Sequence, residues 1–114
     1  MFQVHTLVPE FWCSNFDDSL HFYTEVVGFS VAQRRGNDLH AYLELGNAQI
    51  MIACWKRDGT WEPAPLEKPY GRGVNFQILT DDIQSIYLSA LSADIKPFVE
   101  LHTRWYWRTD RMEE

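Results

Sequence analysis

Apolar residues in the first half of the chain recur with two different spacings, which predict a strand, a helix and three more strands in that order. Residues 7–13 form an apolar strand-like run, and Ser14-Asn15 can then cap a helix whose first turn is acidic at Asp17-Asp18. The apolar face of this helix is predicted to comprise Phe16, Leu20, Tyr23 and Val27, with Gly28 as its left-handed cap. Three strands are predicted over residues 29–34, 39–45 and 48–55, separated by turn-forming residues 36–38 and Gly46-Asn47.

The second half repeats part of this order. Residues 56–72 contain five Gly or Pro residues, too many for a regular element, and are predicted to form a long loop. A strand over 73–79, a helix that Thr80 caps and whose apolar residues run from Ile83 to Leu91, and a strand over 96–101 follow. Residues 103–107 alternate, but no further strand is predicted after them. The pattern therefore predicts an α+β fold with an internal strand-helix-strand repeat.

Bulk composition limits the partners. The 114 residues are 46% hydrophobic, as expected for one globular domain, and carry a net charge of −6. Scattered Lys and Arg argue against binding nucleic acid, whereas an acidic protein suits a cationic small molecule. Cys13 and Cys54 are read as buried thiols in a reducing compartment. Without a signal-peptide pattern or an apolar run of about 18 residues, we expect a cytoplasmic protein with no membrane partner.

Four stretches resemble a known family. They are Val8-Pro9-Glu10, the run 19–29, the run 41–51 and the run Pro69-Tyr70-Gly71-Arg72-Gly73-Val74-Asn75-Phe76-Gln77-Ile78. Together they resemble the glyoxalase/bleomycin resistance protein/dioxygenase (vicinal oxygen chelate) superfamily, and the last run resembles its bleomycin-resistance-like branch. The resemblance implies two βαβββ modules in one domain, with module one at 1–55, a loop at 56–72 and module two at 73–114.

The resemblance also implies a homodimer whose ligand groove lies between subunits. Members normally continue into a final hairpin, so module two is expected to be incomplete. Either the given sequence stops early, or a partner subunit completes the sheet by strand swapping.

Catalytic members of this superfamily bind a divalent metal through His, Gln or Glu on inward strand faces. The matching positions here fall on Val8, Met51 and Asn75. Valine has no donor atom and a thioether is too soft for Mg, Mn or Fe, so we predict no metal, no cofactor and no catalytic residue. Whether His5 or Glu10 holds a vestigial metal stays open. The other three histidines, His21, His40 and His102, are read as surface residues or as residues with satisfied hydrogen bonds, not as metal ligands.

Strand alternation sorts the two faces of each predicted strand. With Val8, Met51 and Asn75 inward, the cavity face also carries Glu10, Trp12, Gln49 and Gln77. The opposite face, which we expect to pack on the helices, carries Leu7, Phe11, Cys13, Ile50, Ile52, Val74, Phe76 and Ile78.

Aromatic residues make up 15% of the chain and include five Trp, more than so small a core needs. We therefore predict that Trp side chains stack on a planar ligand while Glu10 and Glu44 attract its positive charge. The predicted ligand-binding residues are Glu10, Trp12, Glu44, Met51, Trp55, Trp61, Asn75, Gln77, Trp105 and Trp107. Trp12 and Trp55 fit a core or dimer-interface position equally well.

The function predicted from these features is sequestration of a bulky cationic aromatic antibiotic of the bleomycin class, with no bond made or broken. Two alternatives remain. One is a metal-dependent lyase or isomerase, dioxygenase or thiol transferase of the same superfamily. The other is an interaction module that has no small ligand.

Overall fold

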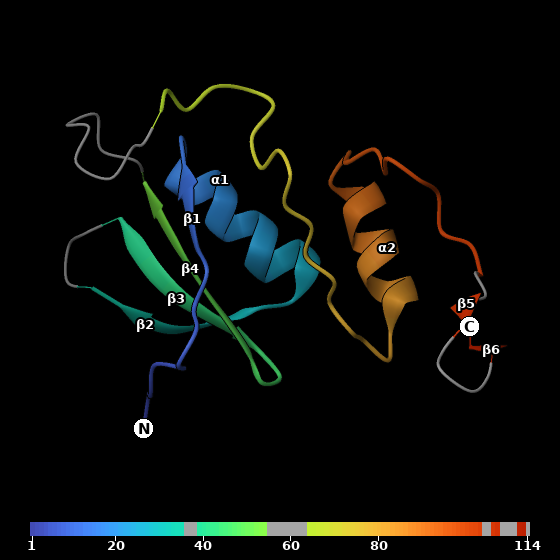
Figure 1. Ribbon diagram of the computed structural model, residues 1–114, viewed down its shortest axis with the longest axis horizontal. Coiled ribbons are helices and arrows are strands. Elements are labelled where there is room, and N and C mark those ends of the chain that lie inside the picture. The colour runs from blue at the N-terminus through green and yellow to red at the C-terminus, as the bar shows by residue number, and fades with distance from the viewer. Residues whose placement is uncertain (36–38, 55–63, 104–105, 108–111, 114) are drawn as a thin grey trace.

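The computed structural model describes residues 1–35, 39–54, 64–103, 106–107 and 112–113. A four-stranded sheet with strand order β1-β4-β3-β2 forms its main body (Figure 1). The strands are β1 (Glu10–Cys13), β2 (Ser30–Arg34), β3 (His40–Leu45) and β4 (Ala48–Cys54). β1 runs parallel to β4, whereas β3 pairs antiparallel with both β4 and β2. These elements confirm the α+β class and the predicted order of the first half.

One continuous helical segment covers one face of the sheet, as α1 (Phe16–His21) followed by the wider π-helical turns of η1 (Phe22–Val27). Asn15 caps α1 by accepting a hydrogen bond from the Asp18 amide at 3.0 Å. The hydroxyl of Thr24 donates to the Leu20 carbonyl at 2.7 Å, a side-chain bond of the kind that bends helices. Gly28 ends the segment at φ 106°, in the left-handed region that favours glycine, as predicted.

The core lies between this helical segment and the sheet. Leu43 and Ile52 are fully buried at its centre. The other buried members are Phe16, Phe29, Ala41 and Ile50, with Phe11, Cys13, Leu20, Tyr23, Val27, Leu45 and Cys54 packed around them. The predicted helix-facing positions of β1 and β4 are therefore confirmed. Leu7 is the exception, since it precedes β1 and is 82% exposed.

The second half of the described chain contains α2 (Ile83–Ser92), which lies against η1 (Figure 1). Its N-cap is Asp82, whose carboxylate accepts hydrogen bonds from the amide and hydroxyl of Ser85 at 3.2 and 2.7 Å. Thr80, the predicted cap, instead accepts a hydrogen bond from the Asp82 amide at 3.1 Å. The prediction of the helix is confirmed and that of its cap is wrong.

The strands predicted over 73–79 and 96–101 are not formed, and these segments run as extended or irregular chain. A strand needs a neighbour to accept and donate its ladder hydrogen bonds. Val74, Phe76 and Ile78, which were predicted to pack on the helices, are exposed because the segment that carries them pairs with no strand. Two short strands that were not expected as a pair, β5 (Tyr106–Trp107) and β6 (Met112–Glu113), form a separate antiparallel ladder.

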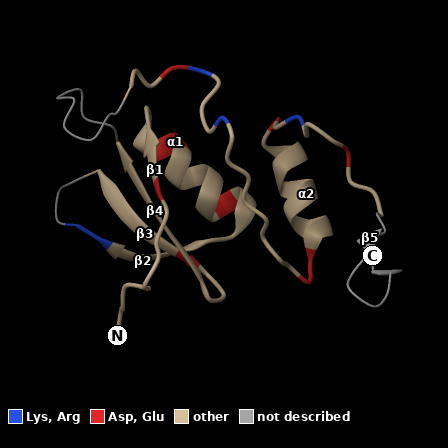
Figure 2. Ribbon diagram, viewed as in Figure 1, with Lys and Arg blue, Asp and Glu red and all other residues tan. Residues whose placement is uncertain are grey.

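Charged residues are distributed without a dominant basic cluster over the described part of the chain. Figure 2 shows the described Lys and Arg residues spread between the end of β2, the segment 64–73 and the turn after α2. Within that part of the chain, no helix has the length and apolar character needed to cross a membrane.

Candidate functional site

The face of the sheet opposite the helices carries the polar and aromatic side chains. Strand register aligns Glu10 of β1 with Met51 of β4, and Met51 with Tyr42 of β3. Alternate residues share a face, so Trp12, His40, Glu44 and Gln49 lie on the same side. The residues of the first module that were predicted to share the cavity face therefore lie together on one face of the sheet.

His40, the first residue of β3, lies on this face and is only 4% exposed, so of its two readings, surface residue or internally bonded residue, the surface one does not apply. Its Nε2 atom lies 3.4 Å from the Met51 Sδ atom and 3.8 Å from a Glu10 carboxylate oxygen. The Tyr42 ring meets the imidazole edge-to-face at 5.2 Å. The contact with Glu10 becomes an ion pair only when the imidazole is protonated.

The side chains around Met51 offer few ligands for the divalent metal that catalytic members of the resembled superfamily bind. Near Met51, the oxygen or nitrogen donors are one carboxylate and one imidazole, while Met51 itself offers a thioether. A hard cation needs several oxygen or imidazole ligands. Among the described residues, no three His, Cys, Asp or Glu side chains converge as a metal-binding group. The donor set at the expected position does not fit that metal.

A groove of about 680 Å³ runs along the edge of the sheet between β1 and the segment 66–76. Its lining is mainly apolar and aromatic: Pro9, Glu10, Phe11, Trp12, Tyr23, Leu66, Tyr70, Gly71, Val74 and Phe76. Glu10 supplies its charged group. We call it the aromatic groove below.

Local contacts hold the wall of the aromatic groove. The Phe76 ring meets the Phe11 ring edge-to-face, with centroids 4.9 Å apart, and Phe11 in turn stacks on Tyr23. The Arg72 side chain donates hydrogen bonds to the carbonyls of Pro69 and Lys68 at 3.1 and 3.2 Å, closing the turn that carries Tyr70. The groove thus combines several aromatic rings with one carboxylate.

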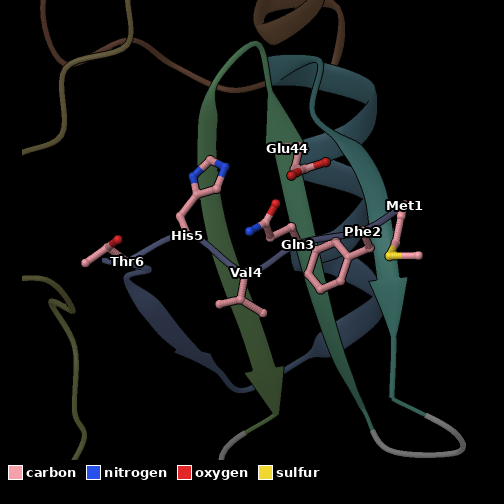
Figure 3. A pocket seen from close by; sticks show the side chains of 7 residues that line it. All are labelled: Met1, Phe2, Gln3, Val4, His5, Thr6 and Glu44. Atoms are coloured by element: carbon pink, nitrogen blue, oxygen red, sulfur yellow. The ribbon is translucent and has the colours of Figure 1, made fainter.

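A second hollow, of about 510 Å³, lies where the N-terminal arm, residues 1–6, crosses the open face of the sheet. Figure 3 shows the arm passing in front of the strands, with Gln3 beside Glu44. Gln49, 4% exposed, ties the arm down: its carboxamide oxygen accepts from the His5 amide at 2.8 Å, and its nitrogen donates to the Gln3 carbonyl at 3.0 Å. The same nitrogen donates to a Glu44 carboxylate oxygen at 2.8 Å.

The structure gathers some of the predicted ligand-binding residues and separates others. Glu10 and Trp12 share the aromatic groove, Met51 lies beside Glu10, and Glu44 lines the second hollow. Asn75 and Gln77 are exposed, and Gln77 lines a different hollow beside Leu45 and Asp82. Asn75 and Gln77 do not lie beside Glu10, because the segment 73–79 does not form a strand paired with β1.

Four predicted tryptophans cannot be placed in this site. Trp55, Trp61 and Trp105 lie outside the described residues. Trp107 belongs to β5, but its side chain is outside the description.

Tyr42 and Tyr70 were missed as site residues. Tyr42 stands two positions from Glu44 in an alternating strand, so the pattern that selected Glu44 also contained the signal for Tyr42. Tyr70 is in a segment rich in turn-formers, where no periodicity indicates which side chains meet.

The two cysteines lie opposite each other on β1 and β4 and are both free thiols. Burial raises the pKa of the Cys13 thiol above its ordinary value, while a hydrogen bond with Ser19 opposes this shift in part. Cys13 Sγ also donates to the Ala53 carbonyl at 3.2 Å. Burial likewise raises the pKa of Tyr23. A raised thiol pKa disfavours the nucleophilic thiolate, in keeping with the reading of Cys13 as a buried thiol.

Comparison with known proteins defines the class. The Glyoxalase/Bleomycin resistance protein/Dioxygenase superfamily matches residues 3–112, and the chain belongs to this superfamily. Among solved structures, it is similar to a glyoxalase/bleomycin resistance protein/dioxygenase superfamily member from Vibrio splendidus 12B01. The two share 31% identity over 87% of this chain and 76% of the other, with a TM-score of 0.40. No curated protein matches the chain.

Proposed function

We propose that this protein binds and sequesters a bulky cationic aromatic ligand of the bleomycin class without catalysing a reaction on it. The observation that carries the proposal is the aromatic groove, in which Trp12, Tyr70 and Phe76 surround a site that Glu10 makes negative. Stacking and cation–π contacts contribute roughly 0.5–2 kcal/mol each, so three or four give a useful affinity. Sequestration then scales with the amount of protein.

The chemistry of the donor set supports binding over catalysis. Two of the three inward ligand positions matched to the superfamily carry Val8 and Met51, which have no hard donor atoms, and the third carries the amide of Asn75. Cys13, a potential nucleophile, has a raised pKa because it is buried. The bleomycin-resistance-like branch, rather than an enzymatic one, is the assignment that we propose.

A homodimer in the cytoplasm is part of this proposal. Ile78 and Leu79 expose apolar side chains beyond the aromatic groove, in a segment that pairs with no strand. A strand from a second copy of the chain would pair with this segment and cover these side chains. A strand-swapped arrangement would do the same.

Titration of the purified protein with bleomycin, followed by Trp fluorescence, tests the proposal. We expect saturation at one ligand per groove and, by mass spectrometry, recovery of the unmodified drug after prolonged incubation. Turnover that depends on an added divalent ion would assign the protein to the enzymatic branch instead. The absence of saturable binding would favour an interaction module.

Glu10→Gln is the matching charge variant. The Glu10 side chain is about one-third exposed, so solvent screens it in part. We expect a three- to tenfold weaker affinity, which corresponds to about 0.7–1.4 kcal/mol. Glu100→Gln removes one negative charge from an exposed position outside the groove and should change the affinity less than twofold. Equal effects of the two variants would show that net charge, not the groove, attracts the ligand.

A further inference from the structure

We propose that Gln49 and Glu44 form an amide-recognition site for an extended, peptide-like part of the ligand, and that the N-terminal arm fills this site when no ligand is bound. This inference rests on the proposed binding function and adds a second contact surface to it. It concerns the open face of β3 and β4, whereas the aromatic groove lies at the edge of β1.

The pairing at Gln49 follows the pattern by which one residue of a parallel strand pairs with its neighbour. Like such a residue, the carboxamide offers one acceptor and one N–H donor on the same side. Here the oxygen accepts from the N–H of His5 and the nitrogen donates to the C=O of Gln3, two residues apart in an extended segment. Because both bonds go to backbone atoms, Gln49 recognises an extended chain whatever its side chains are.

The carboxamide of Gln49 is held in the orientation that pairs with the arm. Glu44 accepts the other Nε2 hydrogen at 2.8 Å, which fixes the orientation of the amide. Gln49 is 4% exposed with the arm in place, so a ligand that displaces the arm must replace both hydrogen bonds to avoid leaving the carboxamide buried and unpaired. An occupant with backbone-like amides does this.

The arm itself is weakly held, which allows an exchange. Beyond the Gln49 pair, Phe2 packs on Tyr42 with ring centroids 4.9 Å apart. Val4 is 50% exposed, and the His5 and Thr6 side chains line an open hollow (Figure 3). The occupant that fits has two amides in an extended chain, an aromatic group over Tyr42 and a positive charge near Glu44.

A capped peptide with the sequence of residues 1–6, acetylated and amidated, is the probe, and its affinity is measured by isothermal titration. The protein variant His5→Pro lacks the N–H that Gln49 accepts, so its own arm competes less well. We expect it to bind the peptide about tenfold more tightly than the wild-type chain. Val4→Pro, whose amide takes no part in the Gln49 pairing, is the control and should show a smaller gain.

Backbone methylation makes the test specific. The same peptide with an N-methyl group at the amide corresponding to His5 keeps every side chain but loses the donor. We expect about tenfold weaker binding to His5→Pro. Equal affinity of the two peptides, or no gain in His5→Pro over Val4→Pro, would overturn the amide site and make the arm a fixed part of the fold.

Bleomycin titrations separate this inference from the proposed function. Gln49→Met keeps the length of the side chain and removes its amide, and thermal melting followed by circular dichroism checks that it folds. We expect its affinity for bleomycin to fall about tenfold and not to vanish, because the contact with the aromatic groove remains. An unchanged affinity would refute the amide site alone. If neither this variant nor the wild-type chain binds the drug, the proposed function fails, and the peptide titration still decides whether the amide site exists.

Discussion

The Phe11–Phe76 contact is a direct test of whether the aromatic groove exists as described. Phe76 lies in the segment that forms the outer wall, and that segment has no ladder hydrogen bonds to β1. The wall therefore depends on side-chain contacts, of which this edge-to-face pair, with centroids 4.9 Å apart and planes at 68°, has a favourable geometry. Removing one ring should loosen the wall.

The expected magnitude follows from the geometry. Aromatic pairs at this separation contribute about 0.5–1.5 kcal/mol beyond burial. Phe76 is 52% exposed, so solvent competes for part of its surface and a value of about 0.7 kcal/mol is appropriate. The coupling is measured by a double-mutant cycle with Phe11→Leu, Phe76→Leu and the double variant, from denaturant unfolding free energies.

A second cycle provides the control. Phe11→Leu combined with Phe2→Leu pairs two rings with different partners, since Phe2 packs on Tyr42 across the sheet from the helices. These two changes should add within about 0.3–0.5 kcal/mol. If the Phe11/Phe76 coupling is no larger than that of the control cycle, the segment 66–76 does not pack on β1, and the groove that carries the proposed function is not formed.

Two further predictions concern titratable groups. Burial raises the pKa of Cys13, so this thiol should react with a thiol reagent only above the pH at which an ordinary cysteine reacts. Its contribution to stability should fall as the pH rises past the pKa of the unfolded thiol. A reaction–pH profile of the Cys54→Ala variant with an ordinary midpoint would contradict this prediction. Hydrogen bonds from Ser85 lower the pKa of Asp82, so the stability that this cap gives α2 should be present above the unfolded pKa and lost as the pH falls through the folded one. Asp82→Ala should reduce the acid-side slope of the melting temperature.

The sequence predicts β2, β3 and β4 well because each of these strands has its pairing partner nearby in the chain. β3 and β4 are separated only by the turn at Gly46, and Leu43 faces Ile50 directly across it. Local alternation and local pairing then agree, which makes the pattern reliable. The same holds for Asn15 and Gly28, whose capping roles depend on immediate neighbours.

The second half shows where that reasoning stops. Residues 73–79 have the alternation of a strand, but alternation does not supply a neighbour, and the segment stays unpaired. Asn75 and Gln77 were placed in the site on the assumption that this strand would pair, so their placement failed with it. The burial of His40 was left open for a related reason, because it depends on side chains from β1 and β4 that its own strand cannot predict.

The two proposed contact surfaces lie on neighbouring parts of one sheet face, which favours a single long ligand over two independent ones. Glu10 of the aromatic groove is in register with Met51, and Met51 with Tyr42, the ring on which the arm packs. An extended ligand could thus place its aromatic part at β1 and its amides on Gln49 while crossing Met51. A thioether is polarisable and adapts its shape, so it suits a surface that a long ligand crosses without fixed polar contacts. A metal-binding side chain at this position would favour a reaction on the ligand, whereas methionine favours binding the ligand without a reaction.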